Sequence, residues 1–284
     1  MKNERENSPT GRPRKPHARR LALWQALLLG GVIALWHLLT APGLLPPLFF
    51  ENDQQAAFFF GEPLKVAQRM AQWFWIEGDI YAHLGITLLE TLLAFGIGSL
   101  MGLAAGLWLA LSPLAASLLE PYIKAINAMP RIILAPIFAV WFGLGVASKV
   151  ALGITLVFFI VFFNVYQGVK EVSPVILANA RMLGADSRQL LRHVYLPSAT
   201  SWVFSSLHTS VGLAFVGAVV GEYLGSAAGV GYLIHQAEGV FDINTVMAGI
   251  VVLTAFALSL DAIVGAVERR LMKWQPSAGE TERL

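Results

Sequence analysis

The sequence predicts an all-α, polytopic integral membrane protein with six transmembrane helices and one cytoplasmic helical hairpin. Three observations predict this class. Apolar residues make up 56% of the 284 residues and charged residues only 13%, whereas a soluble domain carries about 25% charged residues. The apolar residues gather in runs of about 20, the length that a spanning helix needs. Of the 20 lysines and arginines, 15 lie in the two tails and in the hairpin region that begins at Lys170, and six spans place all three segments in the cytoplasm, as the positive-inside rule requires.

The chain begins with a basic tail that leads into an apolar run. Residues 1–20 are rich in Lys, Arg and Pro, and we expect them to be disordered. A nucleic-acid-binding arm is the alternative for such a tail. A cytoplasmic N-terminus explains the same charges as the flank of a span over Leu21–Leu39, so we expect no nucleic-acid partner. Residues 21–80 hold this span and an external lead-in, where Glu62–Trp75 is predicted to form an amphipathic helix on the outer membrane face.

The core of the predicted fold, residues 81–268, opens with a span over Leu84–Leu111. Gly98, Gly102 and Gly106 are spaced by four residues. They therefore give this helix one smooth face that another backbone can approach closely. Glu90 lies inside the same span, and the sequence leaves its role open.

Residues 113–145 form a span that three prolines interrupt: Pro121, Pro130 and Pro136. Proline removes a backbone hydrogen bond and kinks a helix, and broken helices line the pathway in many transporters. Lys124, Asn127 and Arg131 follow one another at spacings of three and four residues, so they are candidate pathway residues if the solute is an anion. Anchoring of Lys124 and Arg131 at the membrane interface explains them equally well.

Three further spans are predicted over Val150–Tyr166, Trp202–Val220 and Thr245–Val267. Between the last two, four glycines interrupt the apolar pattern: Gly221, Gly225, Gly229 and Gly231. They predict a flexible loop or a short re-entrant turn at the outer face. Glu222 lies among them and joins the candidate pathway residues. The chain ends in a cytoplasmic tail, residues 269–284.

The segment Ser173–Pro197 is a polar island between two apolar runs, and its signals predict two short helices. Ser173 followed by proline is a helix start, because the serine oxygen can cap free backbone amides. Gly184 is a helix stop, and Asp186 with Gln189 has the spacing of a capping box for a second helix that ends near Tyr195. Basic side chains give this hairpin a positive face: Arg181, Arg188, Arg192 and His193.

The hairpin also resembles a known signature, in which EAA is followed by three residues, Gly, nine residues, Ile, one residue and Leu-Pro. Here Ala178-Asn179-Ala180 precedes Gly184, and Val194 precedes Leu196-Pro197 in the same register. Ala178 and Asn179 replace the glutamate and the middle alanine. With the flanking blocks AMPRIILAPIFAVWFGLG, GEYLGSAAGVGYLI and VERRLMKW, the chain resembles permeases of binding-protein-dependent ABC importers, and most closely those for nitrate, taurine and aliphatic sulfonates.

This resemblance implies a type I importer permease fold in the bacterial inner membrane, with both termini in the cytoplasm. It implies a homodimer, two cytoplasmic ATP-binding subunits that bind ATP and magnesium, and an extracytoplasmic solute-binding protein. The solute would be a small anion such as nitrate, taurine or an alkanesulfonate, moved by alternating access. The implied ATPase-coupling residues are Ala178, Asn179, Ala180, Arg181, Gly184, Ala185, Asp186, Arg188, Gln189, Leu196 and Pro197.

The residues themselves give no sign of an enzyme. The nearest approach to a phosphate-binding loop is GLGVASK at residues 143–149, where Ser148 replaces a glycine and Val150 replaces the magnesium-binding Ser or Thr. We therefore expect a separate subunit to hydrolyse ATP. The chain has no cysteine and its six histidines are scattered, so we expect neither a metal site nor a bound cofactor.

Three other functions remain alternatives. An ion-gradient-driven transporter would use intramembrane carboxylates, here Glu90, Glu120, Glu222 and Asp261, all of them near predicted span ends where water or a basic partner can satisfy them. A membrane-embedded enzyme would need a nucleophile with a base or a metal cluster, and the sequence shows neither pattern. A structural scaffold would not need kinked spans and glycine-rich turns, which indicate moving parts.

Overall fold

The computed structural model describes residues 17–41 and 53–271, and these residues form helices joined by short turns, without a strand among them. The predicted all-α class is thereby confirmed. The contacts divide the chain into two units at residue 67, within α3. Most of the two expected tails, residues 1–16 of 1–20 and 272–284 of 269–284, lies outside the described residues, as do residues 42–52 of the lead-in. Residues 17–20 are helical, so the expected disorder is wrong for them.

The first unit holds α1 (His17–Thr40) and α2 (Asp53–Phe60). The indole N–H of Trp36 in α1 donates to the Phe60 carbonyl at 3.2 Å. Residues 20–40 are apolar and long enough to span a membrane. Side chains on all sides of this helix are exposed, as in a helix that faces lipid. The prediction of a span over Leu21–Leu39 is confirmed in its place and length.

A short amphipathic helix follows across the boundary between the two units, where the sequence predicts one. It comprises α3 (Pro63–Ala71) and a π-helical turn over Gln72–Glu77. Val66 and Trp73 are buried, while Arg69 pairs with Glu77 at 2.8 Å on the exposed side. The left-handed Gly78 ends the helix.

Three long helices form the core of the second unit: α4 (Ile80–Leu111), α7 (Val146–Lys170) and α10 (Leu196–Gly225). Small and β-branched side chains fill the space between them: Ala94, Val157, Val161, Val165 and Ala214. Gly98 lies against Val157 and Gly106 against Val165, so α4 and α7 run parallel. Gly217 lies against Gly153, and Gly168 near the other end of α7 lies against Trp202. The helix α10 is therefore antiparallel to α7.

The glycine stripe of α4 is confirmed as a surface of close helix contact. A Cβ atom on Gly102 would lie 2.7 Å from the Phe158 carbonyl oxygen, a distance that atoms do not tolerate. Similar distances to α7 hold for Gly98 and Gly106. Small residues at this spacing let two backbones pack directly against each other.

The broken span consists of α5 (Pro113–Ala128), a 3-10 turn over Arg131–Leu134 and α6 (Ala135–Phe142), with a bend of 81°. The break lies at Met129-Pro130, whereas α5 continues through Pro121 and Pro136 lies in the first turn of α6. Only one of the three prolines therefore interrupts the segment. The described residues hold five helices that can cross a membrane, or six spans if the bent pair is one. Because α4 and α7 are parallel, the chain must cross once between them, which favours six.

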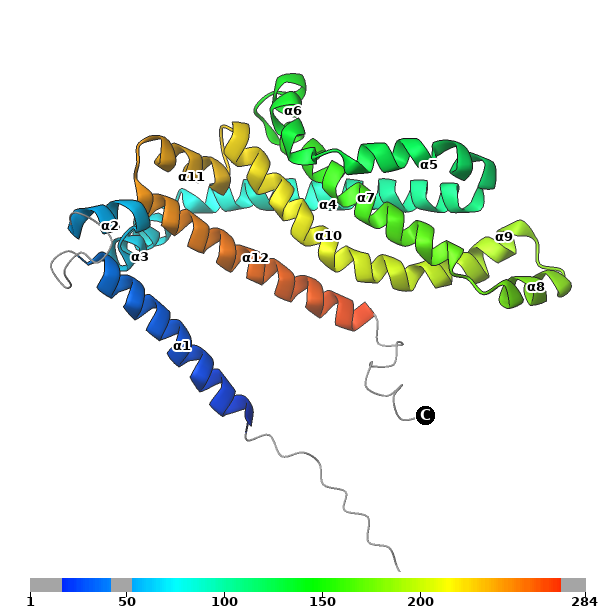
Figure 1. Ribbon diagram of the computed structural model, residues 1–284, viewed down its shortest axis with the longest axis horizontal. Coiled ribbons are helices and arrows are strands. Elements are labelled where there is room, and N and C mark those ends of the chain that lie inside the picture. Colours follow the sequence, from blue (N-terminus) through cyan, green and yellow to red (C-terminus); the bar gives the residue numbers. More distant parts are fainter. Residues whose placement is uncertain (1–16, 42–52, 272–284) are drawn as a thin grey trace, which may run out of the picture. The chain divides into compact units, whose positions relative to one another are not determined.

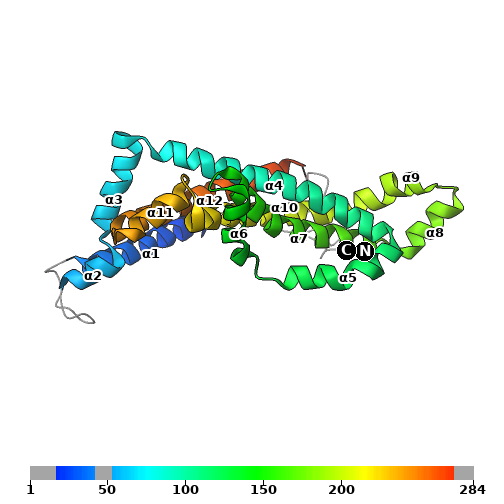
Figure 2. The same ribbon diagram turned by 90° about the horizontal axis from the view of Figure 1, so that it is seen from above.

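The glycine-rich segment after the fifth span is mostly helical, so the prediction of a flexible loop is wrong there. Gly221 and Gly225 belong to α10, and only residues 226–229 form a turn. The chain then folds back as α11 (Val230–Gly239), which packs on α10 and on α12 (Ile243–Leu271). The predicted short turn is confirmed, and it comprises residues 226–229. Figures 1 and 2 show α11 at one end of α4, α7 and α10, and α8 and α9 projecting at the other end.

Candidate functional site

The first arm of the hairpin is α8 (Pro174–Met182), which starts where the sequence predicts. Proline lies in its first turn, where a missing N–H costs nothing. The Ser173 side chain makes no capping hydrogen bond, contrary to expectation. Its backbone carbonyl instead accepts the Leu177 N–H at 3.2 Å. The start of this arm is therefore fixed by the backbone conformation of Pro174, without a side-chain cap.

The turn at Gly184 is a complete Schellman motif, which explains several positions of the signature. Gly184 has φ = 84°, a left-handed conformation. Its N–H donates to the Arg181 carbonyl, and the Ala185 N–H donates to the Ala180 carbonyl, both at 3.0 Å. This pair of bonds satisfies the last carbonyls of α8 and requires a left-handed residue between them. The predicted helix stop is confirmed.

The second arm begins with the predicted capping box. The Asp186 carboxylate accepts the Gln189 N–H at 2.7 Å, and the Gln189 side chain accepts the Asp186 N–H at 2.9 Å. The arm does not end near Tyr195. It continues from α9 (Ser187–Leu190) through a π-helical turn over Leu191–Tyr195 directly into α10. Pro197 lies in the first turn of α10, where proline is tolerated.

The tip of the hairpin exposes apolar side chains, which the sequence reasoning missed. Leu183 is 89% exposed and Met182 is 81% exposed. Val175 and Ile176, both about two turns away on α8, are exposed as well. We call these four residues the apolar tip. Exposed apolar patches mark interaction sites, and the spacing of seven between Val175 and Met182 was a signal that could have found this one.

The candidate pathway residues of the broken span have local partners. Lys124 pairs with Glu120 at 2.5 Å, and both are exposed. The Arg131 guanidinium donates to Asn127 and lies 4.5 Å from the centre of the Phe159 ring. Lys124 also lines a cavity of about 400 Å³ between α5, α7 and α10, together with Asn164, Gln167 and Trp202 among others. Lys124 is therefore the candidate that faces an open space large enough for a small solute.

Glu222, the fourth candidate, does not line an open space, because its side chain is completely buried. Glu90 of α4 and Lys149 of α7 are also buried, at 1% exposure each. Of the two expected ways to satisfy the intramembrane carboxylates, water or a basic partner, burial excludes water for Glu90 and Glu222. We call Glu90, Lys149 and Glu222 the buried triad.

Hydrogen bonds connect the triad to the turn before α11. The Glu222 carboxylate accepts the Thr87 hydroxyl at 2.6 Å and the Gly231 N–H at 2.7 Å. The Thr87 hydroxyl also accepts the Val230 N–H at 3.2 Å. The Lys149 ammonium donates to the Leu144 and Gly145 carbonyls at 2.5 and 3.1 Å, which fixes the corner before α7.

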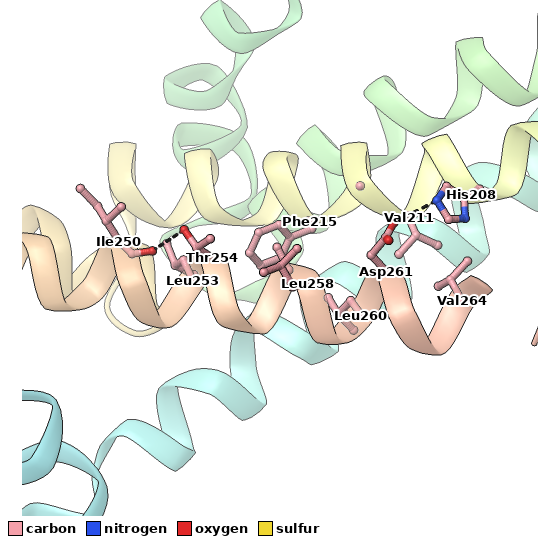
Figure 3. Close-up of a pocket in the computed structure, with 12 residues that line it drawn as sticks. His208, Val211, Phe215, Ile250, Leu253, Thr254, Leu258, Leu260, Asp261 and Val264 are labelled. Atoms are coloured by element: carbon pink, nitrogen blue, oxygen red, sulfur yellow. Dashed lines mark hydrogen bonds and ion pairs between the residues drawn. The ribbon is translucent and has the colours of Figure 1, made fainter. Parts of the chain in front are cut away.

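Asp261 of α12, the last carboxylate of the ion-gradient alternative, has a partner on α10. His208 Nε2 lies 2.9 Å from Asp261 Oδ1. Both residues line a mostly apolar cavity of about 470 Å³ between α10 and α12 (Figure 3). Figure 3 shows the pair at one end of this cavity and Phe215 with Leu258 farther along it.

Apolar helices of spanning length, one of them broken, together with an exposed hairpin at one end define a polytopic membrane transport subunit. A family model described as "Binding-protein-dependent transport system inner membrane component" matches residues 96–273. The chain belongs to this family. It is thus the membrane-spanning permease subunit of an ATP-driven importer, as the hairpin signature predicts.

Similar proteins agree with this assignment over nearly the whole chain. The putative aliphatic sulfonates transport permease protein SsuC of Bacillus subtilis is 29% identical over 93% of this chain and 92% of its own length. The taurine transport system permease protein TauC of Escherichia coli is 28% identical over 96% of both chains. A probable ABC transporter permease protein of Haemophilus influenzae is 30% identical over 82% of this chain and 90% of its own.

Two solved structures share the fold. One shows inward-facing conformations of the MetNI methionine ABC transporter, with a TM-score of 0.54 at 20% identity over 66% of this chain and 95% of that chain. The other is a crystal structure of an amino acid ABC transporter with histidines, with a TM-score of 0.58 at 20% identity over 72% and 97%. At this identity the likeness supports the architecture of the permease and leaves the solute open.

Proposed function

We propose that this permease works as a homodimer that docks through its hairpin onto two cytoplasmic ATP-binding subunits. ATP and magnesium bind to those partners, and this chain does no chemistry of its own. A solute-binding protein delivers the solute from outside the bacterial inner membrane. The observation that carries the proposal is the apolar tip, which is exposed at a turn held rigid by the Schellman motif and the capping box.

The direction of the helices supports a cytoplasmic hairpin. The basic residues of the hairpin lie between the end of α7 and the start of α10, and basic segments favour the cytoplasmic side. With six spans, both chain termini then lie on the same side as the hairpin. The turn before α11 and the buried triad lie at the outer end.

The solute is proposed to be a small sulfonate or a related anion. SsuC and TauC, named for aliphatic sulfonates and taurine, match nearly the full chain. The cavity beside Lys124 offers a cation, which an anionic solute would share with Glu120. An ammonium suits a sulfonate, because the sulfonate oxygens only accept hydrogen bonds.

The docking proposal is tested by co-purification. The tagged permease is expressed with its ATP-binding subunit, and the amount of retained subunit is measured for the wild type and for Leu183→Asp. We expect the substitution to abolish the complex, because a charged side chain at the centre of an apolar contact must be desolvated without a partner. Leu114→Asp on α5 serves as the control, since Leu114 is 82% exposed outside the hairpin.

Equal retention of the ATP-binding subunit by the wild type and the Leu183 variant would contradict docking through the tip. The ion-gradient alternative gives a different result in vesicles. It predicts uptake without ATP that collapses when a protonophore is added, whereas the importer requires ATP and tolerates the protonophore.

A further inference from the structure

The buried triad has an unbalanced charge if all three side chains are ionised. Two carboxylates and one ammonium would leave one net negative charge with almost no exposure to solvent. An uncompensated buried charge is very unfavourable. The ring of His83 of α4 stacks on that of Tyr232 of α11 and accepts the Gly229 N–H at the same turn. One proton on a carboxyl group removes the imbalance.

The hydrogen bonds identify which carboxyl group holds that proton. Both oxygens of Glu222 accept hydrogen bonds, from Thr87 and from the Gly231 N–H. This is the environment of an ionised carboxylate. Glu90 Oε2 is buried and has no donor in the part of the chain that the structure describes. Glu90 follows Thr87 by three residues on α4, and the Thr87 hydroxyl donates to Glu222, so the two carboxyl groups face the same region between α4 and α10. Two adjacent buried carboxyl groups interact favourably only when one of them donates an O–H.

We propose that Glu90 is a permanently protonated carboxylic acid that donates to the ionised Glu222, and that Glu222 in turn neutralises Lys149. The triad then carries no net charge. It joins α4, α7 and α10 at the end remote from the hairpin, about 30 Å along α7 from Lys170. The triad thereby holds the three helices together so that they move as one rigid body, and we call it the latch.

The glycines around the turn fit this latch. Gly229 has φ = 104° and lies directly over the Glu222 carboxyl group, where an added Cβ would be 2.1 Å from Cδ. Gly221 brings α10 against the Lys149 side chain, with an added Cβ at 2.9 Å from Cγ. The Gly229 N–H donates to His83 Nδ1 at 3.0 Å. The absence of side chains therefore lets the turn close over the carboxylate and exclude water.

The remaining titratable groups near the turn face away from the latch. Tyr223 donates to Glu238, and His235 lies beside the same carboxylate. The helix α6 contributes no titratable side chain.

The test compares two neutral isosteres, Glu90→Gln and Glu222→Gln, in the full chain co-expressed with its ATP-binding subunit. Glutamine at 90 still donates to Glu222, so we expect the yield of folded complex and its uptake rate to stay within twofold of the wild type. Glutamine at 222 forces Glu90 to supply the counter-charge of Lys149 without the hydrogen bonds from Thr87 and Gly231 that stabilise the Glu222 carboxylate, so we expect the yield to fall by more than about tenfold. The double variant Lys149→Met/Glu222→Gln should recover most of this loss.

Infrared spectroscopy gives a readout that does not depend on the stability of the Glu222 variant. The wild type should show the C=O stretching band of a buried carboxylic acid at neutral pH, and Glu90→Gln should lack it. Absence of the band from the wild type, or its persistence in Glu90→Gln, would overturn the proposal. Equal damage by the two glutamine substitutions, or no damage by either, would also overturn it.

Discussion

The side chains of Asp186 and Gln189 each accept the backbone N–H of the other, at 2.7 and 2.9 Å. This reciprocal cap fixes the start of the second hairpin arm. Because the arm runs without a break into α10, the cap also defines the direction in which a force on the hairpin reaches the membrane span. A rigid second arm would transmit such a force as a lever.

Replacement of Asp186 by Ala should loosen this arm. Loss of a helix cap costs about 1 kcal/mol, which here acts on the first turn of α9 and leaves the membrane spans intact. We expect faster amide hydrogen exchange over Ser187–Leu190 and a reduced stimulation of ATP hydrolysis by solute. Asp186→Asn retains an acceptor and is the matched control. Unchanged exchange in the Ala variant would show that the cap does not hold the arm.

Replacement of Gly102 by Val should separate α4 from α7. The first added carbon already meets the Phe158 carbonyl oxygen at 2.7 Å and the Val161 Cβ at 2.9 Å, so the helices must move apart. Overpacking of this kind costs about 1–3 kcal/mol or more. We expect a clearly lower melting temperature in detergent for this variant.

The control for that prediction is Gly96→Val in the same helix, because no heavy atom lies within 4 Å of a Cβ added there. It carries the same loss of helix propensity without the clash. Identical melting temperatures for the two variants would show that the glycine stripe is not the contact surface.

Replacement of Lys124 by Met should weaken solute binding from the cavity of about 400 Å³. Loss of one hydrogen bond to a charged group costs about 1.5–3 kcal/mol, so KM for an anionic solute should rise at least tenfold with little change in ATP hydrolysis. Lys65→Met is the control, because Lys65 forms a similar exposed pair with Glu62. An unchanged KM would remove Lys124 from the pathway.

The parts of the molecule that the sequence predicts well depend on local signals. Gly184 and the Asp186–Gln189 pair act within a few residues, so their pattern predicts their geometry. The spans follow from length and apolarity, and the glycine stripe follows from a spacing of four. The break at Pro130 was harder to place, because Pro121 and Pro136 give the same signal and yet fit within helices.

The buried triad could not be predicted, because its members come from three different helices. Thr87 and Glu222 are 135 positions apart in the sequence, so no local sequence pattern predicts their contact. The sequence shows Glu90 and Glu222 as intramembrane carboxylates, but it shows Lys149 only as part of a poor match to a phosphate-binding loop. The parallel packing of α4 on α7, with α10 antiparallel to α7, brings the three charges together.

The Gly184 turn is proposed to couple ATP hydrolysis to transport. The most direct measurement of this coupling is ATP-driven uptake by Gly184→Val. The left-handed conformation costs a side chain about 1–2 kcal/mol, and more when the residue is β-branched. No heavy atom of this chain lies within 4 Å of a Cβ added at Gly184. A loss of uptake therefore comes from the altered backbone turn and not from a clash within the permease. Gly184→Asn, which tolerates this conformation, and Gly96→Val are the controls.

The assay measures uptake of labelled taurine or an alkanesulfonate into vesicles that hold the permease, its ATP-binding subunit and its solute-binding protein. We expect Gly184→Val to insert normally but to take up solute at under about a tenth of the wild-type rate. This corresponds to a conformational cost of about 1.4 kcal/mol or more at the turn. Both controls should remain active. Uptake by Gly184→Val at the wild-type rate, with ATP still required, would contradict this coupling.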